Sequence, residues 1–208
     1  MKIVFISDTH NKHKHISVPD GDILVHCGDF TGMGYTHEIA SFNAWLGTLK
    51  HPVKLICAGN HDISFERDHH FAKSLITNGT YLEHESIVIN GISFFLSPYS
   101  PRFLRWAFMK ERGEDILQKW KEIPEGVDVL VTHGPPHSIL DSIMFGSESL
   151  GCEDLYREVI LRVKPTISAH GHIHGGYGRI EVNSTLFINA SICNEEYQPV
   201  NKPIEIEI

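Results

Sequence analysis

Five short clusters of aspartate, asparagine and histidine recur along this sequence at spacings that suit metal chemistry. In chain order they are Asp8-x-His10, Gly28-Asp29, Gly59-Asn60-His61-Asp62, His133-Gly134 and Gly171-His172-Ile173-His174. Aspartate can bridge two cations with its two oxygens, neutral histidine donates one nitrogen, and asparagine supplies a neutral oxygen. Two divalent ions held ~3.5–4 Å apart activate a water molecule and neutralise charge on a transferring phosphoryl group. The clusters therefore predict a binuclear metal site suited to hydrolysis.

Each cluster also has an ordinary structural explanation when it is taken alone. Aspartate and histidine often occupy strand-to-helix turns as caps or solvated residues, and Gly-Asp is common turn chemistry. Strand alternation alone would place His172 and His174 on one face of a strand without any metal. Five clusters in order, nearly all at the ends of apolar runs, would rarely arise from turn preferences. The metal interpretation is therefore favoured.

The apolar runs that precede the clusters have the length and composition of buried strands. Residues 2–7, 22–27 and 53–58 are rich in β-branched and other apolar side chains, and each runs directly into a cluster. Residues 127–131 and 166–169 do the same. Open α/β sheets collect ligands at the carboxyl ends of their strands, so we expect the clusters to meet there.

Helices and hairpins are predicted between these strands. Apolar residues at helical spacing predict a helix over 36–50, with His37, Glu38 and Asn43 on its outer face. Three further helices are predicted, near 69–78, over 115–121 and over 152–163. Hairpins are predicted at Asn90-Gly91, between 86–89 and 92–96, and around Asn183-Ser184, between 178–182 and 185–188.

The segment from Ser97 to Arg112 is expected to overhang the site. Its aromatic residues are expected to pack in the core or in a lid rather than to form a platform for bases. These residues are Tyr99, Phe103, Trp106 and Phe108. Histidines outside the clusters are expected to lie mostly in solvated segments. They are His13, His15, His37, His51, His69, His70, His84 and His137, whereas His26 falls within a predicted strand.

Composition indicates an ordinary globular chain of one domain, residues 1–208. Hydrophobic residues make up 41% and charged residues 21% of the 208 residues, and no repeat or linker is visible. The formal net charge of −8 argues against stable binding to nucleic acid through a basic surface. No run approaches the ~20 apolar residues of a membrane-spanning helix, and no export signal is evident. Four widely spaced cysteines favour reduced thiols and a cytoplasmic location, although their even number leaves a disulfide framework open.

Together, the clusters resemble the signature of the calcineurin-like metallophosphoesterases, which reads D-x-H, G-D, G-N-H-D/E, a later H and G-H-x-H. A closer resemblance, to the metallophosphoesterase-domain (MPPED-type) branch, covers nearly the whole chain. It is carried by Ile123 to Asp128, Thr132 to Pro136, Gly151-Cys152, Gly175 to Gly178, Ile188 to Ser191 and Gln198-Pro199. The resemblance implies an α/β fold of two mixed β-sheets packed face to face in a sandwich flanked by helices, with four α/β/β/α layers. It also implies an activity similar to that of cyclic-nucleotide phosphodiesterases.

Carried over residue by residue, the resemblance implies seven metal ligands. Asp8, His10 and His174 hold the first ion, Asn60, His133 and His172 hold the second, and Asp29 bridges them. Some animal members of the branch have glycine where His172 stands, so His172 predicts a fuller site here.

The resemblance also implies a role for His61, and the neighbouring polar residues Asp62 and His170 carry expectations of their own. His61 faces the substrate, where it stabilises the phosphorane and protonates the leaving oxygen as a general acid. Asp62 stands where glutamate is common in this branch, and we expect it to support the loop or orient a neighbour. His170 is expected to contact substrate, brace His172 or pack in the core.

We therefore expect hydrolysis of a phosphodiester in a small nucleotide, with cyclic nucleotides favoured, by a hydroxide that two metal ions activate. Manganese is the favoured metal, and iron, zinc or nickel also suit mixed oxygen and nitrogen ligands. A broad phosphomonoesterase or a protein phosphatase is the enzymatic alternative, because the same metal centre serves these reactions. The negative net charge disfavours a nuclease. A non-catalytic metal-binding scaffold is the alternative from another class. The expected partner is a small phosphorylated substrate, and the sequence predicts no oligomeric state.

Overall fold

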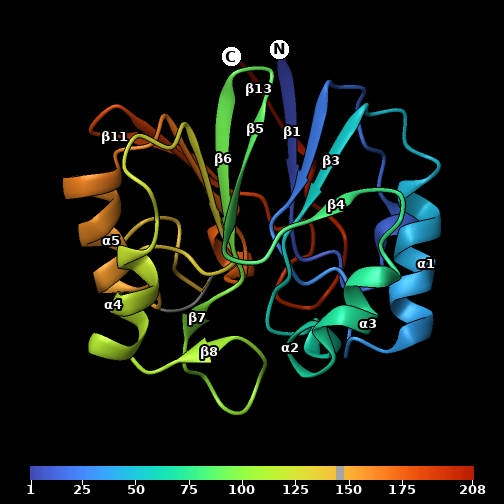
Figure 1. Cartoon of the computed structure of the whole chain (residues 1–208), viewed down its shortest axis with the longest axis horizontal. Coiled ribbons are helices and arrows are strands. Elements are labelled where there is room, and N and C mark those ends of the chain that lie inside the picture. The colour runs from blue at the N-terminus through green and yellow to red at the C-terminus, as the bar shows by residue number, and fades with distance from the viewer. Residues whose placement is uncertain (144–147) are drawn as a thin grey trace.

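Two β-sheets face one another, and helices cover the outer face of each (Figure 1). The computed structural model describes residues 1–143 and 148–208. The strand order is β13-β1-β2-β3-β4 in the first sheet and β11-β12-β10-β9-β6-β5 in the second. This confirms the predicted α/β/β/α sandwich of two mixed sheets.

The first sheet carries the first three clusters. Its strands are β1 (Lys2–Ile6), β2 (Ile23–His26), β3 (Val53–Ile56), β4 (Thr80–Tyr81) and β13 (Ile204–Glu207). β1 to β4 pair in parallel, and β13 runs antiparallel to β1 at the edge. Because the strands are parallel, the polar residues that follow β1, β2 and β3 emerge at the same end of the sheet.

The second sheet carries the other two clusters. Its strands are β5 (Glu85–Ile89), β6 (Ile92–Ser97), β9 (Val129–Thr132), β10 (Ile167–His170), β11 (Gly178–Val182) and β12 (Thr185–Asn189). The four inner strands are parallel, and β5 and β11 pair antiparallel as hairpin partners at the two edges. Asn90 and Gly91 join β5 to β6 with φ of 52° and 83°, as the predicted two-residue hairpin turn requires.

Strand alternation divides the apolar residues between two sides of each sheet. Ile3 and Phe5 of β1 belong to the core between the sheets, whereas Val4 and Ile6 pack with the helices outside. In the second sheet Val131 faces the shared core and Leu130 faces the opposite helices. Both sides of these strands are therefore buried, which explains their uninterrupted apolar sequence.

Among the described residues, three helices cover the first sheet and two cover the second. They are α1 (Thr36–Leu46), α2 (Ile63–Arg67) and α3 (His69–Ser74) on one side, and α4 (Glu114–Lys121) and α5 (Glu153–Glu158) on the other (Figure 1). Three short turns of helix are η1 (His13–His15), η2 (Val159–Val163) and η3 (His174–Gly176). Within the described ranges, no helix has both the length and the apolar character needed to cross a bilayer.

Several sequence predictions differ from these elements in detail. α1 ends at Leu46 rather than at residue 50, because Gly47 and Thr48 close the last turn with bonds to nearby carbonyls. Glu38, predicted on the outer face of α1, is buried because its carboxylate accepts bonds from the preceding loop. The predicted helix over 152–163 is α-helical only to Glu158 and continues as the wider turn η2.

Candidate metal centre

The five clusters meet where the carboxyl ends of β1, β2, β3, β9 and β10 approach one another. Four of the seven predicted ligands have left-handed backbone geometry: Asp8 (φ 52°), His10 (39°), Asp29 (56°) and His172 (66°). Such conformations cost about 1–3 kcal/mol each and persist where the surrounding structure imposes them, commonly at functional sites. The expectation that the clusters share one edge is confirmed for both sheets. His172 and His174 follow β10 rather than lie in it, so strand alternation does not explain them.

One group of ligand atoms comes from Asp8, His10 and His174. The Nε2 atoms of His10 and His174 lie 3.3 Å apart, and Asp8 Oδ1 lies 3.8 Å and 3.4 Å from them, respectively. The Ser191 hydroxyl and the backbone N–H of His172 donate to the Asp8 carboxylate and fix its orientation. Nitrogen and oxygen lone pairs packed this closely, and largely withdrawn from water, are stabilised by a positive charge among them. A divalent cation would supply that charge.

A second group comes from Asp29, His133 and His172, whose candidate ligand atoms lie within 4.8 Å of one another. His133 Nε2 lies 3.4 Å from Asp29 Oδ2 and 2.9 Å from Asn60 Oδ1. Asp29 Oδ2 also lies 3.8 Å from His10 Nε2, in the first group. Its Oδ1 accepts the His61 backbone N–H at 2.7 Å. The Asp29 carboxylate thus stands between the two groups.

Backbone carbonyls fix the tautomers of two predicted ligands. His174 Nδ1 donates to the Asn194 carbonyl at 2.8 Å, and His133 Nδ1 donates to the Cys27 carbonyl at 3.1 Å. A carbonyl only accepts, so Nδ1 carries the proton in each ring. In the neutral ring, the Nε2 lone pair is then left to face the cluster, as a metal ligand requires.

The site favours cations at some positions and neutral rings at others. Burial alone would lower the pKa of His133, but the Asp29 carboxylate raises it to about 9. Burial lowers the pKa of His10 and of His172 to about 4, so both rings are neutral near pH 7. Although burial opposes it, the neighbouring histidines hold the pKa of Asp29 well below its usual range. Ionised aspartate and neutral histidine are the forms that bind metal.

Two glycines of the clusters are required by close approach. A Cβ on Gly59 would lie 2.3 Å from Asp29 Oδ1, and one on Gly171 would lie 2.0 Å from Asp8 Oδ2. Neither contact is sterically possible without moving a ligand carboxylate. The Gly residues of these clusters therefore allow loops from different strands to pack against the two aspartates.

Asp62 joins the loops that follow β2 and β3. Its Oδ2 accepts the backbone N–H groups of Asp29 (2.9 Å) and Gly59 (2.8 Å), and its Oδ1 accepts the N–H and hydroxyl of Thr31. Burial and the Asp29 carboxylate raise the pKa of Asp62 to about 7, against the effect of these bonds. The side chain therefore supports the loop rather than facing the cavity, as expected from the sequence.

His61 is held at the edge of the metal groups by its own contacts. Its Nδ1 donates to the Gly32 carbonyl at 2.8 Å, which leaves Nε2 for the cavity. The Trp106 ring stacks on the His61 ring, with centroids 4.2 Å apart and planes inclined by 26°. Glu38 secures the Gly32 loop by accepting the backbone N–H groups of Met33 (3.0 Å) and Tyr35 (2.9 Å). No pattern in the sequence linked Trp106 or Glu38 to His61.

Several other histidines have structural places. His26 Nδ1 accepts the Gly28 N–H, so its Nε2–H donates to Thr9, between two predicted ligands. His170 is fully buried at the end of β10, and burial lowers its pKa to about 3, which keeps the ring neutral. His13 and His51 are buried, so their expected solvation was wrong. His13 packs between Phe42 and Trp45, a long-range contact that sequence spacing did not reveal.

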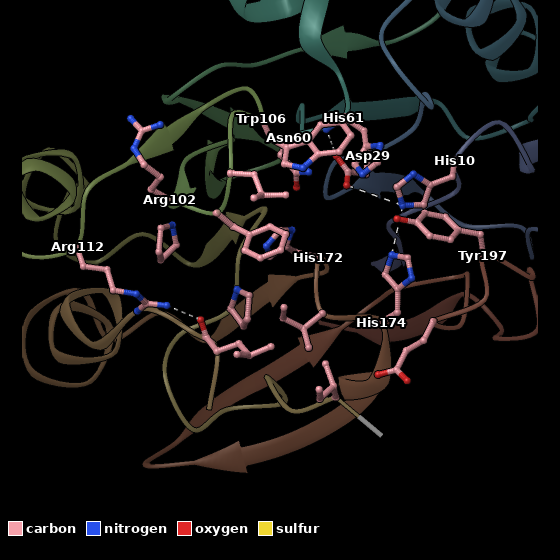
Figure 2. A pocket seen from close by; sticks show the side chains of 18 residues that line it. His10, Asp29, Asn60, His61, Arg102, Trp106, Arg112, His172, His174 and Tyr197 are labelled. Atoms are coloured by element: carbon pink, nitrogen blue, oxygen red, sulfur yellow. Dashed lines mark hydrogen bonds and ion pairs between the residues drawn. The ribbon is translucent and has the colours of Figure 1, made fainter. Parts of the chain in front are cut away.

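A cavity of about 590 Å³ opens over the two groups (Figure 2). His10, Asp29, Asn60, His172 and His174 line one part of it. Another part of the cavity wall is mainly apolar and is formed by Phe103, Leu104, Trp106, Ile143 and Leu150. The two short strands β7 (Ser100–Pro101) and β8 (Met109–Lys110) support the loop that provides much of this wall. The predicted overhang of Ser97 to Arg112 is confirmed.

The basic residues of the cavity are engaged with the protein. Arg112 donates to the carbonyls of Leu150 (2.8 Å) and Gly151 (2.7 Å). These bonds join the segment that ends at Arg112 to the segment around Leu150. Arg102 pairs with Glu111. The segment after Pro136 contributes Ile143 and Leu150 to the wall, and residues 144–147 of that segment lie outside the described residues.

Comparison with known proteins agrees with this geometry. A family model described as calcineurin-like phosphoesterase matches residues 1–176, which include all five clusters. The chain belongs to the calcineurin-like phosphoesterases. Because function resides in the site rather than in the fold, the activity of this chain depends on the residues of the five clusters.

Relatives and solved structures extend the family assignment. The chain is 39% identical over 230 aligned residues to metallophosphoesterase domain-containing protein 1 of Homo sapiens, covering 100% of this chain and 71% of that protein. It is 38% identical to UPF0046 protein K07C11.7 of Caenorhabditis elegans, covering 98% and 74%. The crystal structure of the protein TT1561 of Thermus thermophilus matches with a TM-score of 0.55 at 13% identity, covering 90% and 88%. At that identity the structural likeness supports the fold alone.

Proposed function

We propose that this protein is a metal-dependent phosphodiesterase of small nucleotides, with cyclic nucleotides as the favoured substrates. The observation that carries the proposal is the position of the Asp29 carboxylate between two groups of largely buried ligand residues. A carboxylate has two oxygens, so one shared in this way suits a pair of metal ions. Family membership supports phosphate ester chemistry at the same residues.

The proposed ligand assignment follows the two groups. Asp8, His10 and His174 would hold one divalent ion, Asn60, His133 and His172 would hold the other, and Asp29 would be shared between them. When bound, such ions lower the pKa of water to produce a nucleophile and neutralise charge on the phosphoryl group. Manganese is the proposed metal, because mixed oxygen and nitrogen ligands suit it. The same ligands also accommodate iron, zinc or nickel, and the supply of each metal in the cell decides among them.

His61 is the proposed general acid. Its Nδ1 proton is committed to the Gly32 carbonyl, so only Nε2 can exchange a proton with a substrate. The ring lies 4.7 Å from that of His10 and lines the cavity beside both groups. Protonated at Nε2, it donates to the departing ester oxygen and stabilises negative charge on the phosphoryl group.

The cavity wall supports a nucleoside ester rather than a phosphorylated protein segment. Phe103 and Leu104 are 61% and 66% exposed and still line the cavity, so they present apolar surface to a ligand. Binding sites of small molecules combine apolar walls with a few polar groups in this way. The formal net charge of −8 disfavours a long nucleic acid as the substrate.

Rates on matched substrates test the proposal. Protein reconstituted with manganese is assayed on 3′,5′-cyclic AMP, on p-nitrophenyl phosphate and on a phosphoserine peptide, with Asp29→Ala as the inactive control. The proposal predicts the highest kcat/KM on the diester and loss of all activities in the control. A strong preference for either monoester contradicts the substrate assignment, and equal activity in Asp29→Ala contradicts the metal assignment.

The compartment and the extent of the catalytic unit are also proposals. The four cysteines are free and buried, a state compatible with a reducing cytoplasm, which we propose as the compartment. We propose that residues 1–208 act as one catalytic domain, because ligands from both sheets are needed for the site.

A further inference from the structure

Tyr197 stands over the metal groups in a position that neither the family signature nor the ligand set explains. It lies in the loop from Cys193 to Pro199, which closes through pairing of those two residues. Tyr197 lines the same cavity as the predicted ligands and is 46% exposed. It belongs to none of the apolar clusters of the described core. Core packing therefore does not account for it.

The backbone of Tyr197 is held in an unfavourable conformation by contacts that also serve a predicted ligand. Its φ is 58°, in the left-handed region that a bulky side chain rarely adopts. The Asn194 carbonyl accepts both the Tyr197 N–H (2.9 Å) and the Nδ1–H of His174 (2.8 Å). The Asn194 side chain accepts the N–H groups of Glu196 and Gln198 and braces the same turn. Strain maintained in this way is typical of functional positions.

The ring of Tyr197 is directed at the first metal group. Its centroid lies 4.8 Å from that of His10 and 5.3 Å from that of His174, with the planes inclined by 71° and 80°. Figure 2 shows the ring beside these two histidines, with its hydroxyl on the cavity side. Within residues 1–143 and 148–208, the structure shows no hydrogen bond from this hydroxyl. A donor in the cavity is thus available to a ligand.

We propose that Tyr197 is a substrate-contacting residue whose hydroxyl donates a hydrogen bond to a non-bridging phosphoryl oxygen on the His10 side of the site. This rests on the proposed function only in requiring a phosphoryl group at the metal centre. The His61 and Tyr197 rings both lie beside His10 but are 6.3 Å apart, so the two residues contact different oxygens. Tyr197 and His61 then hold the phosphoryl group from two sides.

Substitution of the hydroxyl alone tests the proposal. Tyr197→Phe keeps the ring and its contacts with both histidines. Tyr156→Phe is the matched control, because Tyr156 lies on α5, outside the second sheet, and packs with the outer apolar cluster. Three quantities are measured: manganese content, the dissociation constant of inorganic phosphate for the manganese-loaded protein, and kcat/KM on whichever ester the wild type hydrolyses best.

The proposal predicts that Tyr197→Phe binds inorganic phosphate and turns over ester about 10- to 100-fold less well, as expected for loss of a bond to a charged acceptor. Its manganese content equals that of the wild type, and Tyr156→Phe is unchanged in all three quantities. Unaltered phosphate binding in Tyr197→Phe overturns the proposal, and so does loss of metal, which would assign the residue to ligand packing. A wild type that prefers monoesters contradicts the proposed diester substrate but leaves this comparison intact, because phosphate binding is measured separately.

Discussion

Removal of the Asp62 carboxylate is predicted to lower the free energy of unfolding more than removal of a carboxylate on the surface does. Asp62→Ala leaves the backbone N–H groups of Asp29, Thr31 and Gly59 without their acceptor. Each buried donor left unsatisfied costs about 1–3 kcal/mol, which gives about 3–9 kcal/mol for three. The Thr31 hydroxyl adds little, because it can turn to the His61 carbonyl, 3.3 Å away.

Part of this loss is offset. The substitution also removes a buried carboxylate that the Asp29 carboxylate repels, the repulsion that helps to raise the pKa of Asp62 to about 7. We therefore expect a loss near the low end, about 3–5 kcal/mol, as is usual when a buried network is broken by removal of one partner. Asp62→Asn keeps one acceptor oxygen and is expected to lose about half as much.

Urea unfolding of metal-free protein measures this loss, because metal binding would add its own contribution to stability. Asp20→Asn is the control for loss of a charge, since Asp20 is exposed, and it should stay within about 0.5 kcal/mol of the wild type. Because Asp62 orients the loops of two predicted ligands, the manganese dissociation constant of Asp62→Asn should also rise about 10- to 100-fold. An unfolding free energy of Asp62→Ala within about 1 kcal/mol of the wild-type value would show that the three N–H groups do not depend on the Asp62 carboxylate.

Three further predictions concern His61 and the residues that hold it. His61→Ala should retain wild-type manganese content but lose about 10²–10⁴-fold in kcat; loss of metal would instead make it a ligand. Trp106→Leu should lower kcat by up to about 10-fold, because an aromatic pair contributes roughly 0.5–1.5 kcal/mol. An unchanged kcat would show that stacking does not orient His61. Burial would raise the pKa of Glu38, but hydrogen bonds from Met33 and Tyr35 outweigh it and lower the pKa. The ionised Glu38 therefore stabilises the folded protein above about pH 4.3, the value of a free glutamate, and this stabilisation is lost as pH falls through the folded-state pKa. Urea unfolding should accordingly show Glu38→Gln less stable than the wild type at neutral pH, with a difference that narrows in acid; a difference independent of pH would contradict this.

The sequence was sufficient for the strands and for the gathering of the clusters. Runs such as 2–7 and 127–131 are apolar on both sides because both sides are buried, and each ends where polar residues are needed. Parallel strands then bring Asp8, Asp29 and Asn60 to one edge without further information. The paired sheets followed from family resemblance, since strand patterns alone do not say which sheet a strand joins.

Long-range contacts account for what the sequence did not reveal. Tyr197 and His10 are in contact although they lie near opposite ends of the sequence. Trp106, in the loop between β7 and β8, contacts His61 in the same way, across a long stretch of sequence. Glu38 looked like a solvated residue by helical periodicity, but the loop before α1 folds over it. His13 is buried for a similar reason, since η1 packs against α1.

The number of manganese ions bound per chain decides whether the two groups of ligand residues form a binuclear site. Protein stripped with a chelator, reconstituted with manganese and freed of excess metal is analysed by mass spectrometry for metal content, beside Asp29→Ala. We expect two ions per chain in the wild type and at most one in Asp29→Ala, because a single carboxylate stands between the two groups. One ion or none in the wild type, or two retained in Asp29→Ala, would contradict this expectation.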